Sequence, residues 1–211
     1  MKGTFITIEG PDGAGKTSVI KKLIPMLVET VQQEIVATRE PGGSRIAEEI
    51  RELILNPNNT EMDIRTEALL YAAGRRQHLV EKIIPALEAG KVVVCDRFVD
   101  SSLAYQGVAR GIGVVEVAEI NQFATGNLSP DLTLYLDIEA HLGLERINQN
   151  KKNRQFDRLD QETLEFHKKV QSAYLEIAKE HSERIVQIDA SQELEKVVEQ
   201  CYQIIIKKLK Q

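Results

Sequence analysis

The residues best suited to chemistry stand near the N-terminus, where residues 10–17 fit the pattern G-x-x-x-x-G-K-[ST]. Glycines in such a loop allow the main-chain amides to turn inward, toward phosphate oxygens. Lys16 would offset charge on the β- and γ-phosphates, and Thr17 would offer a hydroxyl to Mg²⁺. The motif predicts a nucleoside triphosphate site. Its residues are Gly10, Pro11, Asp12, Gly13, Ala14, Gly15, Lys16, Thr17 and Ser18.

A magnesium ion at such a loop usually also needs a carboxylate, and two carboxylates end apolar, strand-like segments. Asp96 ends residues 92–96, and Asp137 ends residues 132–137. Spacing alone leaves both open. Asp96 is favoured because Arg97 follows it, and a cation beside a carboxylate suits the crevice at the carboxyl edge of a parallel sheet.

The elements that must position these residues alternate between strand and helix patterns along the whole chain. Short apolar runs rich in β-branched residues are typical of strands covered on both faces, and apolar residues every three or four positions indicate helices. Gly74 or Pro85 is expected to bend or divide the long helical stretch that begins after Asp63. Strands are predicted at 4–8, 35–38, 91–96, 132–136 and 184–188, and helices at about 19–31, 46–54, 63–90, 140–147, 164–178 and 194–209. The alternation predicts an α/β fold with a parallel sheet.

Residues 1–211 are expected to form one domain, because no repeat and no linker rich in Pro, Gly or Ser divides the chain. One long polar segment runs from Asn148 to Asp157. By itself it is consistent with a mobile flap or with an exposed loop that has no role.

The composition limits the classes of function. The chain has 27 Lys and Arg against 32 Asp and Glu, a net charge of −5, which opposes binding to a nucleic-acid backbone. No apolar run approaches the ~18 residues of a membrane span, and Glu9 interrupts any signal segment. Cys95 and Cys201 are too few for a disulfide framework, so a cytoplasmic location is predicted.

The same sequence disfavours two other mechanisms. Residues 150–153, Asn-Lys-Lys-Asn, lack the carboxylate of the N-K-x-D motif that reads guanine, which weighs against a regulatory switch. The four histidines lack metal-ligand spacing, and no Ser, Cys or His constellation indicates a covalent intermediate. A phosphoryl-transfer enzyme and a non-catalytic nucleotide-binding module remain as alternatives.

Two further motifs, together with the loop at 10–17, carry a family resemblance. They are Thr38-Arg39-Glu40-Pro41-Gly42-Gly43 and the segment from Asp96 to Gly107, Asp-Arg-Phe-Val-Asp-Ser-Ser-Leu-Ala-Tyr-Gln-Gly. Over nearly its whole length the chain resembles the thymidylate kinases. The resemblance implies a P-loop nucleoside monophosphate kinase fold with a five-stranded parallel sheet and helices on both faces. It also implies a homodimer that phosphorylates dTMP to dTDP with ATP and Mg²⁺, for dTTP synthesis.

The resemblance assigns the acceptor phosphate to Arg39 and Arg97, and the sugar 3′-hydroxyl to Asp12. A planar guanidinium can grip a phosphate through two donors, and a carboxylate accepts from a hydroxyl. Glu40 and Arg51 line the same pocket in relatives.

For the base, the resemblance implies that Tyr71 stacks on thymine and that Arg75 and Gln106 hydrogen-bond its polar edge. Relatives commonly have phenylalanine at the position of Tyr71, so the hydroxyl needs a partner or water. Tyr105 would crowd the 2′ carbon of the sugar, with the Ser101 and Ser102 hydroxyls beside it.

Some relatives carry an arginine inside the phosphate loop, which is absent here. The resemblance therefore implies that a lid at about residues 148–160 supplies Arg154 and Arg158 to the migrating phosphoryl group. Lys16, Arg97 and Asp96 complete the implied catalytic set.

Overall fold

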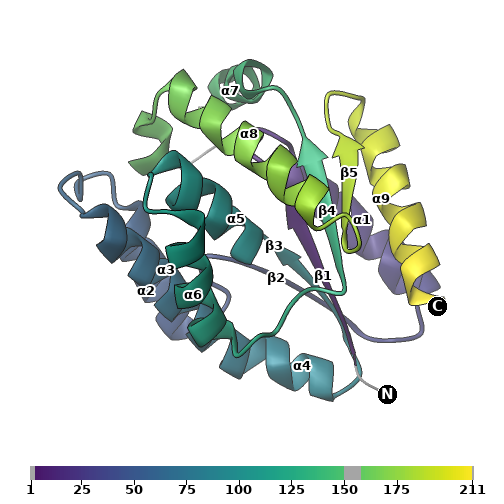
Figure 1. The fold of residues 1–211 in the computed structure, drawn as a ribbon. Coiled ribbons are helices and arrows are strands. Elements are labelled where there is room, and N and C mark those ends of the chain that lie inside the picture. The colour runs from purple at the N-terminus through teal and green to yellow at the C-terminus, as the bar shows by residue number, and fades with distance from the viewer. Residues whose placement is uncertain (1–2, 150–157, 211) are drawn as a thin grey trace.

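The computed structural model describes residues 3–149 and 158–210, which are arranged around one five-stranded sheet (Figure 1). All strand pairs are parallel, and the strand order is β2-β3-β1-β4-β5. The predicted fold class is confirmed. The strands are β1 (Thr4–Glu9), β2 (Ile35–Arg39), β3 (Val92–Asp96), β4 (Leu132–Asp137) and β5 (Ile185–Asp189).

Strand register brings the chemical residues to one edge of the sheet. Asp96 pairs with Ile8 of β1 and with Arg39 of β2, and Asp137 pairs with Asp189. Because all strands are parallel, their carboxyl ends lie together at this edge. The phosphate loop, which follows β1, therefore emerges between the two strands that end in Asp96 and Asp137.

Helices cover both faces because side chains alternate along each strand. Ile6, Ile8 and Val94 belong to a core formed with α1 (Lys16–Thr30) and α9 (Leu194–Leu209). Phe5 and Val93 point to the opposite face, where the helical segment that ends in α4 (Ile84–Glu88) covers them. Beside it, α8 (Leu164–Glu180) covers Tyr135 of β4.

The predicted helical stretch after Asp63 is continuous through Gly74 and is divided just before Pro85. Asp63 caps α3 (Ile64–His78) by accepting hydrogen bonds from two main-chain amides, as predicted. A π-helical segment, η1 (Leu79–Ile83), then joins α3 to α4. Pro85 lies just beyond it and has no amide hydrogen, which accounts for a change in the hydrogen-bond ladder at this point.

The segment between β3 and β4 contains helices that the sequence patterns did not predict. They are α5 (Val99–Ser102), the π-helical η2 (Leu103–Ala109) and α6 (Val114–Thr125). The short α5 and η2 lack a clear apolar period because they are buried on most sides. The remaining described elements are α2 (Arg45–Leu55), α7 (Ala140–Gln149) and the 3₁₀ turn η4 (Arg158–Gln161).

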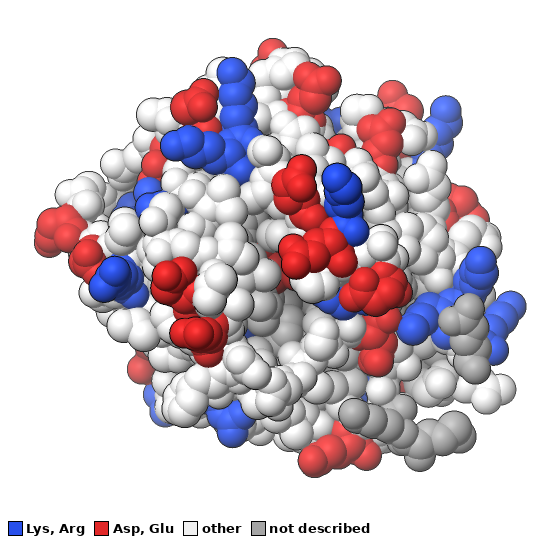
Figure 2. Space-filling model, in the orientation of Figure 1, with Lys and Arg blue, Asp and Glu red and all other residues white. Residues whose placement is uncertain are grey.

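Acidic and basic side chains both occur on the face seen in Figure 2, in separate small groups without one continuous basic surface. Among the described helices, none is long and apolar enough to cross a membrane.

Candidate active site

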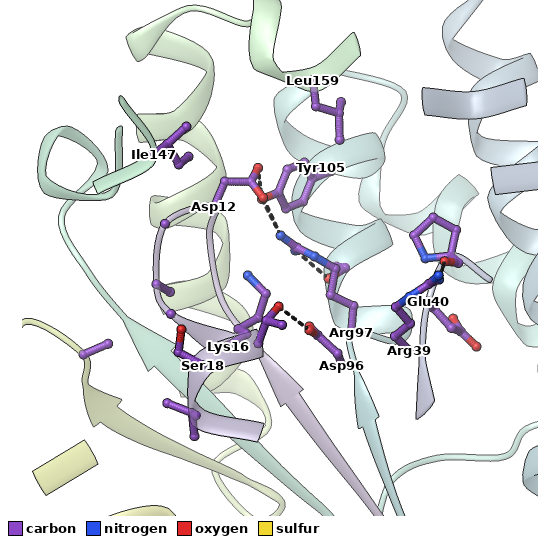
Figure 3. Close-up of a pocket in the computed structure, with 18 of the residues that line it drawn as sticks. Asp12, Lys16, Ser18, Arg39, Glu40, Asp96, Arg97, Tyr105, Ile147 and Leu159 are labelled. Atoms are coloured by element: carbon purple, nitrogen blue, oxygen red, sulfur yellow. Dashed lines mark hydrogen bonds and ion pairs between the residues drawn. The ribbon is translucent and has the colours of Figure 1, made fainter. Parts of the chain in front are cut away.

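A cavity of ≈ 750 Å³ opens at the carboxyl edge of the sheet (Figure 3). The phosphate loop forms one wall, and residues from β2, α2, α3, α5 and η2 form the other. The cavity thus joins the predicted triphosphate site to the predicted acceptor site. Of the predicted residues, its lining contains Asp12, Gly13, Ala14, Gly15, Lys16, Thr17, Ser18, Arg39, Glu40, Arg51, Tyr71, Arg75, Asp96, Arg97, Ser101, Ser102, Tyr105 and Gln106.

The phosphate loop has a backbone that only glycine fits at Gly13. Its φ is +80°, and a Cβ there would lie 2.1 Å from the carbonyl oxygen of Gly143. Lys16 follows the loop and is nearly buried; its Nζ donates to the carbonyls of Gly10 at 2.9 Å and Pro11 at 2.8 Å. Burial, reinforced by Arg97, lowers the pKa of Lys16 to about 8.

Asp96, rather than Asp137, has the geometry of a metal ligand. The Thr17 hydroxyl donates to one carboxylate oxygen of Asp96 at 3.3 Å, and the other oxygen is buried with no hydrogen-bond partner among the described residues. Asp137 accepts instead from Tyr135, at 2.9 Å, and from two glutamine amides, and it does not line the cavity. A buried, unpaired carboxylate oxygen beside a threonine hydroxyl fits a hard cation such as Mg²⁺.

Arg97 links the two halves of the cavity. Its backbone lies in the left-handed region with φ of 70°, a conformation that costs about 1–3 kcal/mol for a non-glycine residue. The guanidinium pairs with Asp12 at 2.7 Å and lies over the ring of Tyr105 at 5.0 Å. Burial would raise the pKa of Asp12, but Arg97 and Lys16 lower it to about 2, so this carboxylate is ionised.

Glu9, at the end of β1, holds the segment that follows Arg97 in place, a role that the sequence analysis did not predict. Its buried carboxylate accepts from the amide of Phe98 at 2.6 Å, the hydroxyl of Ser101 at 2.6 Å and the hydroxyl of Tyr174 at 2.8 Å. These bonds tie β1 to the backbone that directly follows Arg97. Desolvation, with a contribution from nearby Asp100, raises the pKa of Glu9 to about 7. A lone glutamate in a strand gives no sequence signal of this role.

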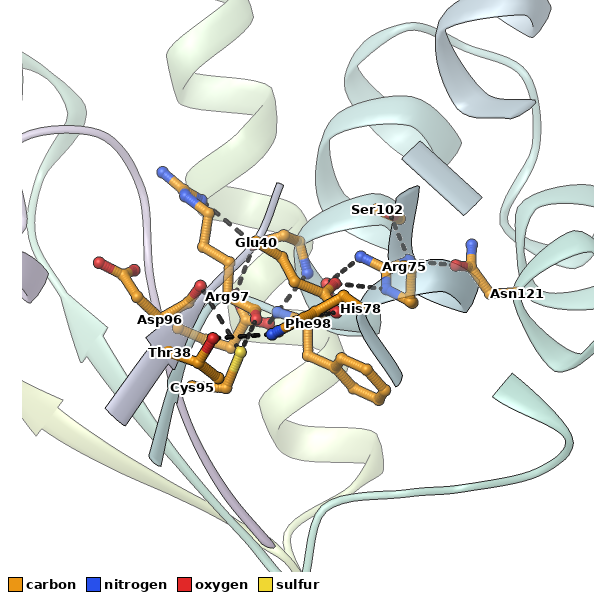
Figure 4. Close-up of polar contacts among 12 residues, drawn as sticks. Thr38, Glu40, Arg75, His78, Cys95, Asp96, Arg97, Phe98, Ser102 and Asn121 are labelled. Atoms are coloured by element: carbon orange, nitrogen blue, oxygen red, sulfur yellow. Dashed lines mark hydrogen bonds and ion pairs between the residues drawn. The ribbon is translucent and has the colours of Figure 1, made fainter. Parts of the chain in front are cut away.

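Glu40 and Arg75, which line the cavity, belong to a buried hydrogen-bond network (Figure 4). The Arg75 Nε donates to Glu40 at 2.7 Å, and the second oxygen of Glu40 lies 3.0 Å from Nδ1 of His78. The Nε2 of His78 lies 2.7 Å from the Thr38 hydroxyl. Glu40 thus holds Arg75 in place.

The carboxylate, imidazole and thiol of Glu40, His78 and Cys95 lie within 4.8 Å of one another, a spacing that a metal ion could bridge. Burial raises the pKa of the Cys95 thiol well above its usual value, and this thiol donates a hydrogen bond to the main-chain carbonyl of Arg97 at 3.2 Å. With Glu40 and His78 also hydrogen-bonded, this cluster is a structural network.

Arg75 has four of its five N–H groups engaged among the described residues. Besides Glu40, they bond to the Ser102 hydroxyl at 3.0 Å, to the amide oxygen of Asn121 and to the carbonyl of Phe98 at 2.9 Å. The fifth N–H of Arg75, on Nη2, makes no hydrogen bond among the described residues.

Two arginines lie at the mouth of the cavity. Arg39 donates to the carbonyl of Pro41 at 2.7 Å and pairs with Glu48 at 3.0 Å, and its side chain is about half-exposed. Arg51 donates to the same carbonyl at 3.0 Å. Both guanidiniums therefore converge on the turn after β2, opposite the phosphate loop.

The structure describes one of the two implied lid arginines. Arg154 lies outside the described residues. Arg158 is buried and does not line the cavity; its Nε donates to the carbonyl of Ile54 at 2.9 Å, and its Nη2 pairs with Glu67. To reach a phosphoryl group, Arg158 would have to leave the buried carboxylate of Glu67.

The donor end of the cavity includes residues that the sequence analysis missed. Arg146 at the end of α7 and Gln192 after β5 line it. The Arg146 guanidinium is held by the carbonyl of Ala190 at 2.9 Å. For Gln192 the available signal was position, because residues just after the carboxyl end of a parallel strand commonly contact ligands. Arg146 lies in the last turn of a helix, where the sequence gives no such signal.

A parallel sheet with a phosphate loop after its first strand, and an arginine-lined acceptor cavity beside that loop, define the class of P-loop nucleoside monophosphate kinases. A model of one family, described as thymidylate kinase, matches residues 8–201. The chain belongs to the thymidylate kinase family.

Individual relatives agree over the full length. The thymidylate kinase of Latilactobacillus sakei subsp. sakei (strain 23K) is 62% identical over 205 residues, 97% of this chain and 95% of that protein. That of Enterococcus faecalis (strain ATCC 700802 / V583) is 60% identical over 208 residues, 99% of this chain and 98% of that protein. A crystal structure of thymidylate kinase from Ehrlichia chaffeensis matches with a TM-score of 0.78 at 30% identity, over 97% of this chain and 99% of that one. The family reaction is ATP-dependent phosphorylation of dTMP to dTDP, which serves dTTP synthesis, and it is the activity of this chain.

Proposed function

We propose that the cavity carries out this reaction by direct in-line transfer, with the donor triphosphate in the loop at 10–18 and the acceptor monophosphate between Arg39 and Arg97. A phosphate oxygen of dTMP attacks the γ-phosphorus of ATP while the bond to the β–γ bridging oxygen breaks, so that ADP leaves. The observation that carries the proposal is the Arg97–Asp12 pair, because it joins the acceptor site to the phosphate loop at 2.7 Å. Catalysis then consists of positioning and charge neutralisation.

The base is proposed to stack on Tyr71, with its polar edge facing Arg75 and Gln106. Tyr71 lines the cavity one helical turn before Arg75, so both side chains face the same space. The remaining N–H of Arg75 would donate to a carbonyl of the base.

The sugar is proposed to bind beside Tyr105 and Asp12. The Tyr105 hydroxyl donates to Asp12 at 2.8 Å, which fixes the ring and leaves the carboxylate with lone pairs for a 3′-hydroxyl. A ribose 2′-hydroxyl would meet the ring of Tyr105, with a steric and a desolvation penalty. The buried hydroxyls of Ser101 and Ser102 are oriented by Arg97 and Arg75 and complete this wall.

Thr17 and Asp96 are proposed to hold Mg²⁺, which when bound neutralises charge on the phosphates of ATP. At the donor end, the guanidinium plane of Arg146 offers a surface on which the adenine can stack.

Residues 1–211 are proposed to act as one domain whose lid spans about residues 148–160. Arg154 and Arg158 are proposed to contribute positive charge to the transferring phosphoryl group, Arg158 after leaving Glu67. A closed lid would also exclude water and favour transfer over hydrolysis.

A homodimer is proposed to form through α3 and α6, which pack against each other. Leu69 on α3 and Val115 and Phe123 on α6 are exposed, and Phe123 is 92% exposed. Exposed apolar side chains grouped on adjacent helices favour a protein interface. Free thiols at both cysteines support a cytoplasmic location, and the net charge of −5 supports the absence of a nucleic-acid partner.

The test is coupled measurement of ADP release across a panel of nucleoside monophosphates, with Lys16→Ala as the inactive control. We expect dTMP to give the highest kcat/KM and Lys16→Ala to lose roughly 10³-fold in turnover while keeping its far-UV circular dichroism. Tight ATP binding without acceptor-dependent turnover would identify a nucleotide-binding module instead. Higher activity with another monophosphate would contradict the acceptor site.

A further inference from the structure

Glu67 is a buried carboxylate beside the acceptor site that the assigned chemistry does not use. It lies on α3, one turn before Tyr71 and two turns before Arg75, and is only 1% exposed. These three residues therefore share the face of α3 that is directed toward the cavity.

Three side chains donate to the Glu67 carboxylate. The Gln106 Nε2 donates to Oε1 of Glu67 at 2.8 Å. The Arg110 Nε donates to the same oxygen at 3.3 Å, and its Nη2 lies 3.3 Å from Oε2. Arg158 pairs with Oε2. Burial opposes ionisation of Glu67, but Arg110 and the hydrogen bonds from Arg158 and Gln106 hold its pKa below the usual value. The group is therefore an ionised carboxylate, which accepts hydrogen bonds and has none to donate.

An ionised carboxylate constrains the side-chain amide of Gln106. Only the NH₂ end can face Glu67, because the carbonyl end would place oxygen against oxygen. Among the hydrogen bonds of the described residues, none uses the Gln106 Oε1, and Gln106 lines the cavity. The carbonyl end is therefore the one that a ligand meets.

We propose that Glu67 is a positioning residue for base specificity: it fixes the Gln106 amide so that a carbonyl oxygen, never an NH₂ group, faces the acceptor base. Arg75 then presents a donor and Gln106 an acceptor. This pair matches a pyrimidine edge with a carbonyl next to a ring N–H, as in thymine. Cytosine carries an amino group next to an unprotonated ring nitrogen, so both contacts would be mismatched.

The inference rests on the proposed placement of the base. Without the charge on Glu67, the Gln106 amide can turn over, because a neutral amide at position 67 offers both a donor and an acceptor. The mismatch between Gln106 and cytosine is then relieved, while the donor of Arg75 still favours thymine.

The test measures the ratio of kcat/KM for dTMP to kcat/KM for dCMP in Glu67→Gln. We expect the ratio to fall about tenfold, through a higher KM for dTMP and a lower KM for dCMP. Glu162→Gln is the matched control. It removes the other carboxylate paired with Arg110, at 2.6 Å, and leaves Gln106 untouched, so its ratio should equal that of the wild type. A Glu67→Gln ratio within twofold of wild type would overturn the inference, as would an equal fall in Glu162→Gln.

Gln106→Met separates this inference from the placement of the base. If Gln106 contacts the base, Gln106→Met lowers the ratio, and adding Glu67→Gln to it changes the ratio no further. A fall from Glu67→Gln that persists in the Gln106→Met background would show a different route of action. An unchanged ratio in Gln106→Met alone would instead contradict the base site itself.

A wild-type measurement serves if Glu67→Gln does not fold. The side-chain NH₂ of Gln106 should give NMR signals whose hydrogen exchange is slow without dTMP and remains slow when dTMP is bound. Rapid exchange that slows only on addition of dTMP would mean that the NH₂ faces the ligand, and the inference would be wrong.

Discussion

Asp12 and Arg97 lie 85 positions apart in the chain and form an ion pair of 2.7 Å inside the cavity. Asp12 belongs to the phosphate loop, and Arg97 follows β3 in a left-handed backbone conformation. The pair therefore couples the positions of donor and acceptor, which must be aligned to within a fraction of an ångström for transfer.

Replacing Arg97 by lysine should remove this coupling and keep the charge. The guanidinium donates to Gly10, Asp12 and Tyr105, among others, which a single ammonium group cannot reproduce. We expect Arg97→Lys to lower kcat/KM for dTMP about 100-fold. Arg45→Lys, at an exposed arginine on α2, is the control in the same steady-state assay. Equal effects in the two variants would contradict the role of Arg97.

Asp96→Asn should weaken the response to magnesium. It replaces the buried carboxylate beside Thr17 with a neutral amide, so the Mg²⁺ concentration for half-maximal activity should rise at least tenfold. Asp137→Asn is expected to leave that concentration unchanged, because Asp137 is hydrogen-bonded outside the cavity. If only Asp137→Asn raised that concentration, Asp137 and not Asp96 would be the metal ligand.

The pKa of Lys16 predicts the pH above which kcat/KM for ATP declines. A lysine with a pKa of about 8 is charged below that pH and neutral above it. We expect kcat/KM for ATP, which reports the free enzyme, to fall as the pH rises through about 8. The check is a profile from pH 6 to 9.5 at a fixed dTMP concentration well below its KM, so that ATP meets the free enzyme. A flat profile through pH 9 would show that Lys16 keeps its proton.

Glu9 should make the protein less stable as the pH rises from 5 to 8. The folded state holds the pKa near 7, above the ordinary 4.5, so the unfolded chain loses its proton first. The contribution of Glu9 to the free energy of unfolding, on the order of 3 kcal/mol, is fully present below pH 4.5 and is lost as the pH rises through 7. In Glu9→Gln, denaturant titrations should lack this fall. A parallel fall in both proteins would assign it to other groups.

Phe123→Glu should separate the proposed dimer. An almost fully exposed phenylalanine contributes little to the monomer fold, whereas a charge at the centre of an interface opposes association. We expect sedimentation to give a dimer for wild type and a monomer for Phe123→Glu, with equal far-UV spectra. Val28→Glu, at an exposed apolar residue of α1, is the control and should remain dimeric.

Local chemistry made much of the protein predictable from sequence. The glycines of the phosphate loop are required by positive φ and close backbone contact at Gly13, so their spacing alone predicted the loop. Continuous apolar strands indicated a parallel sheet because both faces had to be covered, and the family motifs indicated Arg39 and Arg97. The predicted strand and helix positions agree with the structure to within a few residues, apart from η1 and the unpredicted helices between Arg97 and Asp131.

Only the tertiary structure decided which side chains, distant in the chain, are hydrogen-bonded to each other and which are left for a ligand. Within the described part of the chain, it left one oxygen of Asp96 without a hydrogen bond and paired both oxygens of Asp137, although both residues end similar strands. It also turned Arg158 toward Glu67, and it placed Glu9 beneath the backbone next to Arg97. Hydrogen bonding between residues that lie far apart in the chain depends on how strands and helices pack, and spacing along the chain carries no record of it.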